Sequence, residues 1–321
     1  MTVVDGAAAG RAVSVGSERR GALRFDGPAL DLLLVAAVAL PFALRFPVAT
    51  SVLALAAFGL VHTFLELRWV LARFRDFISG SFLAVCCVPV TLIALTRLLG
   101  GARAIEITAG FALLAAAVVQ GYRTGRLTKA PAAVAAAALA IGLAASLDAP
   151  VMYGIVLAHL HNVVTGFLLW EWSSDMAEDR RRAFRAVVAG LFVALPAFVL
   201  LGAADAVLPA SVKGLVVGTV TPGWAGAAMG VRLMAAFALL QVVHYGVWCW
   251  LLPRRSTGPT APSRIDGSWL AAAIAAAAVL ALVFRTDYAT GRTLYTSLAT
   301  YHAYLEFPVV LVLLGGSRAS R

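Results

Sequence analysis

About ten stretches of apolar residues, each long enough to cross a lipid bilayer as a helix, follow one another along this chain of 321 residues. The hydrocarbon core of a bilayer is about 30 Å thick and needs roughly 20 predominantly apolar residues in a helix. The stretches lie near residues 28–46, 48–72, 77–98, 104–122, 131–147, 150–172, 184–206, 224–252, 267–285 and 294–315. We therefore predict an all-α fold, a polytopic integral membrane helical bundle of about ten transmembrane helices.

Two local features qualify this pattern. The segment 208–222 is apolar, but it is short and carries Lys213 between two prolines, which is typical of a re-entrant or interfacial piece and not of an eleventh span. Pro196 and Pro308 lie within spans, where we expect each to kink its helix, because proline has no N–H to donate to the preceding turn.

The composition supports a membrane protein. Hydrophobic residues make up 61% of the chain and charged residues 13%, about half of the roughly 25% that soluble domains carry. The net charge is +10, but the basic residues form short clusters between apolar stretches without a basic aromatic face, which excludes a nucleic-acid partner. Lys129 and Lys213 are the only lysines among 26 basic residues; with the Ala-rich helices, this indicates a GC-rich bacterial genome and a multi-pass protein of the bacterial inner membrane.

The arginines predict the orientation. Cytoplasmic loops carry an excess of Lys and Arg, and alternate loops of this chain are the basic ones when the N-terminus is cytoplasmic. We therefore predict that both termini are cytoplasmic and that the number of spans is even. The predicted units are a cytoplasmic tail (1–27) without the pattern of a cleaved signal peptide, one membrane domain (28–316) and a second cytoplasmic tail (317–321).

All five histidines lie inside predicted spans. They are His62, His159, His161, His244 and His302. The second, sixth, eighth and tenth spans carry them, and all four run from the outer to the inner side, so the imidazoles can lie at similar central depths. Ionisable residues within a span are costly to bury and usually mark function.

Two of these histidines are followed, four residues later, by a glutamate: His62 by Glu66 and His302 by Glu306. Residues four apart on a helix share one face, so each pair is within reach of a common ion. Imidazole and carboxylate together suit iron, zinc or manganese. The pattern predicts an intramembrane metal site.

The remaining histidines leave alternatives open. His159 and His161 are two residues apart, about 200° around a regular helix, so either one is a ligand and the other a supporting donor, or each serves a different metal. Asn162 is a candidate for orienting His159. His244 has Gln241 on nearly the same face and Tyr245 and Trp248 after it.

The layout is similar to that of two membrane families, and the sequence departs from both. Bacterial membrane carotene dioxygenases use several histidines on separate helices around one iron, but their Pro-His-Gly motif is missing. Haem A synthases place four histidines on alternate helices, but with Glu before His. The chain also lacks GxxxxGK[ST], CxxC and HExxH motifs, so neither family is assigned.

Our leading hypothesis is a membrane oxidoreductase or oxygenase with one or two non-haem iron ions, a lipophilic substrate arriving from the bilayer, and an electron donor. Phe64, Phe167, Trp248 and Tyr301 are candidates for the substrate pocket. The alternatives are a haem-binding electron-transfer or haem-modifying protein, a proton- or ion-relay transporter, and a purely structural role in which the glutamates pair with Arg68 or Arg232.

Overall fold

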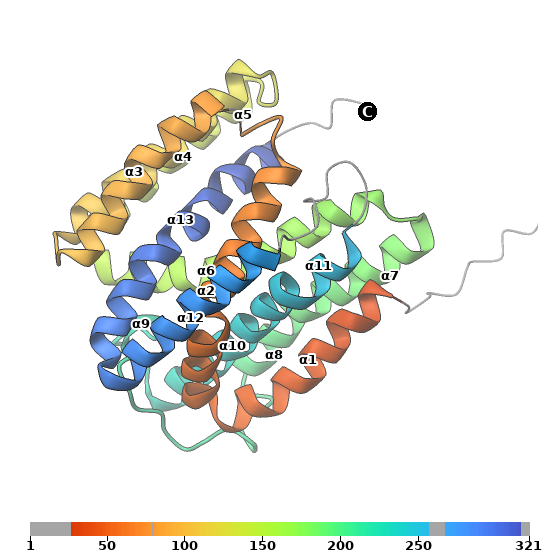
Figure 1. Cartoon of the computed structure of the whole chain (residues 1–321), viewed down its shortest axis with the longest axis vertical. Coiled ribbons are helices and arrows are strands. Elements are labelled where there is room, and N and C mark those ends of the chain that lie inside the picture. The colour runs from red at the N-terminus through yellow and green to blue at the C-terminus, as the bar shows by residue number, and fades with distance from the viewer. Residues whose placement is uncertain (1–26, 79, 257–266, 316–321) are drawn as a thin grey trace, which may run out of the picture.

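The computed structural model describes residues 27–78, 80–256 and 267–315, and within these ranges every regular element is a helix (Figure 1). The two predicted tails and the loop 257–266 lie outside the described residues, apart from Gly27. The all-α prediction is thus confirmed for the described residues. The helices that span the bundle as single α-helices are α1 (Pro28–Arg45), α2 (Pro47–Arg73), α3 (Gly80–Leu98), α4 (Arg103–Arg123), α5 (Lys129–Asp148), α6 (Pro150–Trp172), α12 (Gly267–Thr286) and α13 (Tyr288–Gly315).

Two further rods are composite. The first consists of α7 (Glu178–Ala189), a π-helical turn (Gly190–Ala194) and α8 (Leu195–Leu200). The second consists of α10 (Ala227–Gly246), a π-helical turn (Val247–Leu251) and α11 (Leu252–Arg255). In both, a proline stands just after the wider turn, Pro196 in α8 and Pro253 in α11. The missing N–H of a proline breaks the regular ladder of hydrogen bonds, and the π turn takes up this irregularity. Pro308, by contrast, lies inside α13, which runs through it.

Nine helical rods in the described part of the chain are long and apolar enough to cross a membrane, and α12 adds a shorter apolar stretch, Leu270–Thr286. Many large apolar side chains face outward, for example Val88 and Ile141, which are 72% and 71% exposed. A soluble monomer rarely exposes apolar surface on this scale, whereas a bilayer covers it. A multi-pass membrane protein is therefore the class that the helices indicate.

Proline fixes where several helices begin. Pro28, Pro47 and Pro150 are the first residues of α1, α2 and α6. This position tolerates proline, because the first N–H groups of a helix have no partner within the helix and the fixed backbone angle of proline already suits it. The short connections between α1 and α2 and between α5 and α6 follow from these starts.

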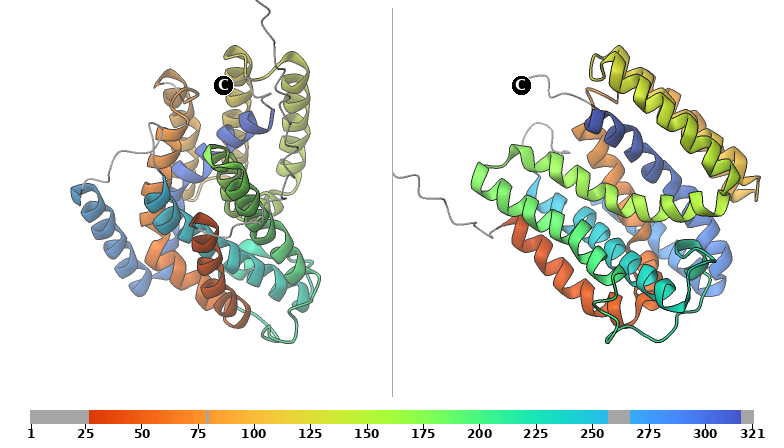
Figure 2. Two further views of the ribbon diagram at one scale, coloured as in Figure 1. Left: turned by 90° about the vertical axis from the view of Figure 1, so that its right-hand side faces the viewer. Right: turned by 180° about the vertical axis from the view of Figure 1, so that it is seen from behind.

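The helices that carry the histidines lie at the centre of the bundle. Figure 1 shows α3, α4 and α5 on one side and α1, α7 and α8 on the other, with α2, α10 and α13 between them. Helix α13 contacts α2, α3, α4, α6 and α12, while α10 contacts α1, α2, α6 and α8. Helix α5 has no buried residue and lies at the edge (Figure 2).

The start of α1 and the end of α13 lie at the same end of the bundle (Figure 1), as an even number of crossings requires. The long connection 201–226 lies at the opposite end and contains only the four-residue helix α9 (Val217–Val220), which packs on α6 and α10. The segment 208–222 is thus not a span. We call this end, predicted to be the outer one, the loop end.

Candidate metal centre

Four imidazoles from four helices converge at the centre of the bundle. His62 of α2, His161 of α6, His244 of α10 and His302 of α13 each offer a nitrogen, and these nitrogens all lie within 4.8 Å of one another. Three of the four rings are at most 1% exposed, whereas the side chain of His161, which faces the cavity described below, is 16% exposed. Their convergence follows from the similar depth of the four histidines along helices that run in the same direction.

His62 and His302 face each other directly. The Nε2 atoms of the two rings are 3.2 Å apart. The other ring nitrogen of His62, Nδ1, donates to the backbone carbonyl of Phe58 at 3.1 Å. Because a carbonyl only accepts, this bond places the proton on Nδ1 and leaves the Nε2 lone pair directed at the cluster. A neutral imidazole in this tautomer can bind a metal through Nε2.

A carboxylate holds His161 in the same way. Nδ1 of His161 lies 2.8 Å from Oε2 of Glu306, to which it donates. This bond leaves Nε2 of His161 as the acceptor atom. Metal-binding histidines commonly donate their other ring N–H to a carboxylate, which fixes the tautomer and makes the ligand more basic.

His244 contacts a hydroxyl on one side and the second carboxylate on the other. Its Nδ1 is 2.7 Å from the hydroxyl of Thr165, and its Nε2 is 3.3 Å from Oε2 of Glu66. Nε2 of His244 has no hydrogen-bond partner in the described structure, and neither does Nδ1 of His302. Buried nitrogens without partners cost free energy, and an ion bound at this point would relieve that cost for a nitrogen aimed at it.

The two carboxylates are as deeply buried as the rings. Glu66 is 0% and Glu306 1% exposed. Both oxygens of Glu66 and Oε1 of Glu306 lack a hydrogen-bond donor among the described residues. A buried carboxylate needs a counter-charge, and a divalent cation among the histidines would supply one to both.

The pairing of glutamates with histidines differs from the sequence prediction. We expected each glutamate to act with the histidine one turn before it. Instead, Glu66 lies against His244 and Glu306 against His161, so each carboxylate contacts an imidazole of another helix. A glutamate and the histidine one turn before it project side by side from the same face of their helix. Each carboxylate therefore meets an imidazole of the helix that packs against this face.

His159 is the one histidine that lies outside the cluster. Its Nε2 is 2.8 Å from the carbonyl oxygen of Val220 in the loop 201–226, and its ring meets the edge of Phe237. Helix α6 is regular here, so the rotation of about 200° between positions 159 and 161 separates the two rings. The Asn162 side chain donates to the carbonyl of Ala158 at 3.3 Å, and not to His159.

A second layer of side chains supports the cluster. The ring of Tyr245 stacks against His62 with ring centres 4.2 Å apart. The hydroxyl of Tyr245 accepts from the Gln241 amide at 3.0 Å, and the Ser51 hydroxyl donates to the same amide at 2.5 Å. Sequence reasoning noted Gln241 and Tyr245 but missed Ser51 and Thr165, since a single hydroxyl in an apolar span is too common to stand out.

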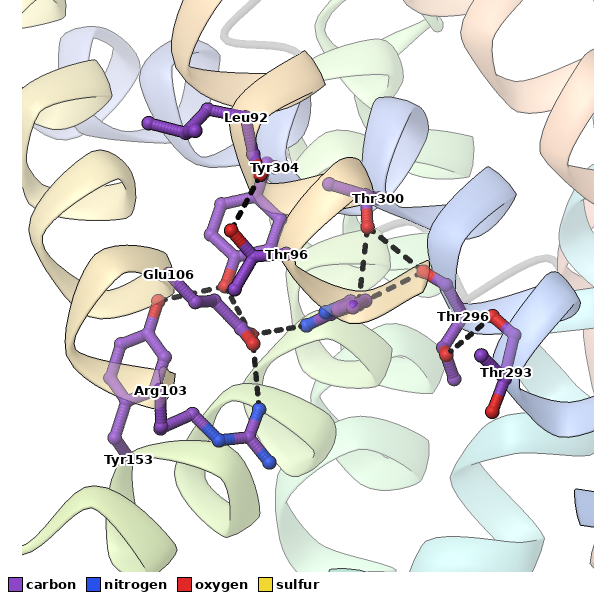
Figure 3. Close-up of polar contacts among 10 residues, drawn as sticks. Leu92, Thr96, Arg103, Glu106, Tyr153, Thr293, Thr296, Thr300 and Tyr304 are labelled. Carbon is purple, nitrogen blue, oxygen red and sulfur yellow. Dashed lines mark hydrogen bonds and ion pairs between the residues drawn. The ribbon is translucent and has the colours of Figure 1, made fainter. Parts of the chain in front are cut away.

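A cavity of about 710 Å³ connects this centre with the loop end of the bundle. His161 and His302 line its inner part, and residues at the ends of α3, α4, α6 and α13 line its mouth. In its wall, Glu106 binds two arginines, Arg97 at 2.5 Å and Arg103 at 2.7 Å. The Tyr304 hydroxyl donates to Glu106 at 3.0 Å and contacts the Tyr153 hydroxyl at 2.8 Å (Figure 3).

Sequence reasoning missed this network, although a lone carboxylate inside an apolar stretch and two nearby arginines were a usable signal. The four residues that the sequence suggested for the substrate pocket also lie elsewhere. Phe64 and Phe167 are 38% and 42% exposed, Tyr301 bonds Thr91, and none of the four candidates lines this cavity. Arg232 binds Asp205 and not a central glutamate.

A second cavity of about 400 Å³ adjoins the first and is almost wholly apolar. It lies among α4, α5, α6 and α13, and Leu157 and Tyr304 line both cavities. Helix α5 is at the edge of the bundle, so this second cavity lies next to the predicted lipid phase.

Comparison with models of protein families, with curated proteins and with solved structures finds no match to this chain.

Proposed function

We propose that this chain is a membrane-embedded, metal-dependent oxidoreductase with a non-haem site, and that iron is its metal. The observation that carries the proposal is the convergence of four imidazole nitrogens from four helices within 4.8 Å. Metal–nitrogen distances of about 2.1 Å place the ligands of one ion at most about 4.2 Å apart. The four rings therefore need to move by less than about 1 Å each to hold one ion.

The geometry favours a small ion over a haem. In a haem protein with two axial histidines, the flat macrocycle lies between the two rings. Here two further imidazoles and two buried carboxylates surround the facing pair His62 and His302. A macrocycle between this pair would collide with them. Two anionic carboxylates beside neutral imidazoles also match the charge of a divalent ion.

The residues around the ion have distinct roles in this proposal. His62, His161, His244 and His302 bind the metal, Glu306 orients the imidazole of His161, and Glu66, beside His244, contributes negative charge next to the ion. The packed helices shield His62 and His244, which are 0% exposed, from water. The bound iron would supply one-electron and dioxygen chemistry; an electron donor outside this chain is part of the proposal.

The two cavities support a lipophilic substrate. The apolar cavity offers a place next to the lipid phase, and the larger one reaches His161 and His302. Pockets that bind small molecules are mostly apolar with a few convergent polar groups, at volumes of roughly 300–1,000 Å³. Both cavities meet this description.

The test is reductant-dependent oxygen uptake by the purified protein, supplied with a lipid extract of its host membrane. We expect uptake in the wild type, loss in His302→Ala, and retention in His159→Ala, which removes an imidazole outside the cluster. Equal uptake in the two variants, or none in iron-loaded wild type, would contradict the proposal.

A further inference from the structure

The charged residues that line the larger cavity are unbalanced. They are three arginines, Arg97, Arg103 and Arg292, and one glutamate, Glu106. Glu106 already binds Arg97 and Arg103. Arg292 has no ion-pair or hydrogen-bond partner in the part of the chain that the structure describes, and its side chain is half-buried. The cavity therefore has an excess of positive charge.

This charge lies at one end of the cavity. Arg292 is in the second turn of α13, at the loop end, and Arg103 is the first residue of α4. The other end is formed by His161 and His302, more than two helical turns deeper in the bundle. Between the two ends, apolar side chains such as Ile155, Leu157 and Phe237 form much of the wall. The cavity thus has a cationic mouth, an apolar middle and the histidine cluster at its far end.

We infer that this cavity binds an anionic amphiphile, with its acidic head group at Arg292 and Arg103 and its hydrocarbon chain directed to His161 and His302. Arginine presents a planar fork of donors that matches carboxylate and phosphate oxygens. An uncharged carotenoid or isoprenoid would cover Arg292 without giving it a counter-charge. A fatty carboxylate and a lysophospholipid phosphate share the required chemistry. The reaction at the far end rests on the proposed function, whereas the binding does not.

The test is equilibrium binding to the full chain in nanodiscs of phosphatidylcholine. Three radiolabelled probes with the same C16 chain separate the contribution of the head group from that of the hydrocarbon chain. They are palmitate, palmitoyl lysophosphatidate and the uncharged hexadecanol. Arg292→Gln is the informative variant, because this arginine supports no described contact whose loss would unfold the protein. Arg285→Gln is the matched control, since Arg285 is exposed at the end of α12, at the same end of the bundle, and does not line the cavity.

We expect at least one anionic probe to bind the wild type and to bind about tenfold more weakly to Arg292→Gln, the loss typical of one charge-assisted hydrogen bond. Arg285→Gln should leave this affinity unchanged. The stronger of the two anionic probes identifies the head group. Hexadecanol binding as tightly as both anionic probes, no binding by any probe, or no effect of Arg292→Gln would overturn the inference.

Metal content, measured on the same samples, separates this inference from the proposed function. Anionic binding that depends on Arg292 in protein without any metal supports the amphiphile site and contradicts the metal centre. Protein that contains iron but shows no selective binding of the anionic probes supports the metal centre and contradicts the amphiphile site.

Discussion

At the residue scale, the central question is which imidazoles act together. The Nε2 atoms of His62 and His302 are 3.2 Å apart, too close for both to carry a proton. One ion between them would use both lone pairs. The two histidines then form a single unit, although 240 residues separate them in the sequence.

We predict that His62→Ala and His302→Ala each remove most of the bound metal, and that the double replacement removes little more. Residues that share one partner are not additive. Metal content per chain after size-exclusion chromatography measures this. Small, additive effects on thermal stability with unchanged metal content would indicate a structural role for both rings.

Glu306→Gln tests the support of His161. The amide keeps an acceptor oxygen near Nδ1 of His161 but removes the negative charge, so we expect metal affinity to fall about 10- to 100-fold. Competition with a chelator of known affinity measures the change. Glu171→Gln is the control, because Glu171 binds Arg73 near the end of α6, away from the cluster. Equal affinities in the two variants would contradict the assigned role.

The sequence was sufficient to find the histidines and glutamates, but not their pairing. Helical periodicity relates residues within one helix, and it correctly separated His159 from His161. It contains no information on which side of α6 faces α13. The contacts between His161 and Glu306 and between His244 and Glu66 depend on that packing, so only the structure reveals them.

At the scale of helices, hydropathy located the spans well and their ends less well. The first span was predicted at 28–46 and is Pro28–Arg45. The seventh was predicted at 184–206, whereas its helix begins at Glu178 and ends at Leu200. The first turn of this helix is charged (residues 178–182), so a search for apolar stretches does not include it. The helix ends two residues before Gly202, whose φ of +90° suits glycine and does not fit a continued α-helix.

Helix packing around the tyrosine pair gives a prediction of its own. A Cβ atom on Gly110 of α4 would lie 2.7 Å from the Tyr153 hydroxyl and 2.9 Å from the Tyr304 ring. We therefore expect Gly110→Ala to destabilise the protein by about 1–3 kcal/mol, seen as a lower midpoint of thermal unfolding in detergent. Gly230→Ala in α10 is the control, because nothing lies within 4 Å of a Cβ there. Equal midpoints for both variants would show that α4 packs differently.

At the scale of the whole molecule, the bundle has two ends of different character. The basic loops and the start and finish of the helical domain belong to one end, and the loop 201–226 and the cationic mouth to the other. The positive-inside rule places the first end in the cytoplasm. The orientation remains a prediction, and it decides from which side polar molecules reach the larger cavity.

Labelling of single cysteines tests the orientation, in a background where the three native cysteines are replaced. A reagent that cannot cross membranes should label Asp148→Cys, which lies at the loop end, and should not label Val4→Cys in intact cells. The reverse pattern would invert the topology and place the cavity mouth on the cytoplasmic side.

The central claim is that the histidine cluster holds a metal ion, and elemental analysis with an absorption spectrum of protein purified without chelators tests it most directly. We predict about one iron per chain and no Soret band in the wild type. His161→Ala should lose the metal, while His159→Ala, two residues away on the same helix, should keep it. A strong Soret band with about one haem per chain would contradict the non-haem site, and absence of any metal would favour a proton relay through the histidines and glutamates.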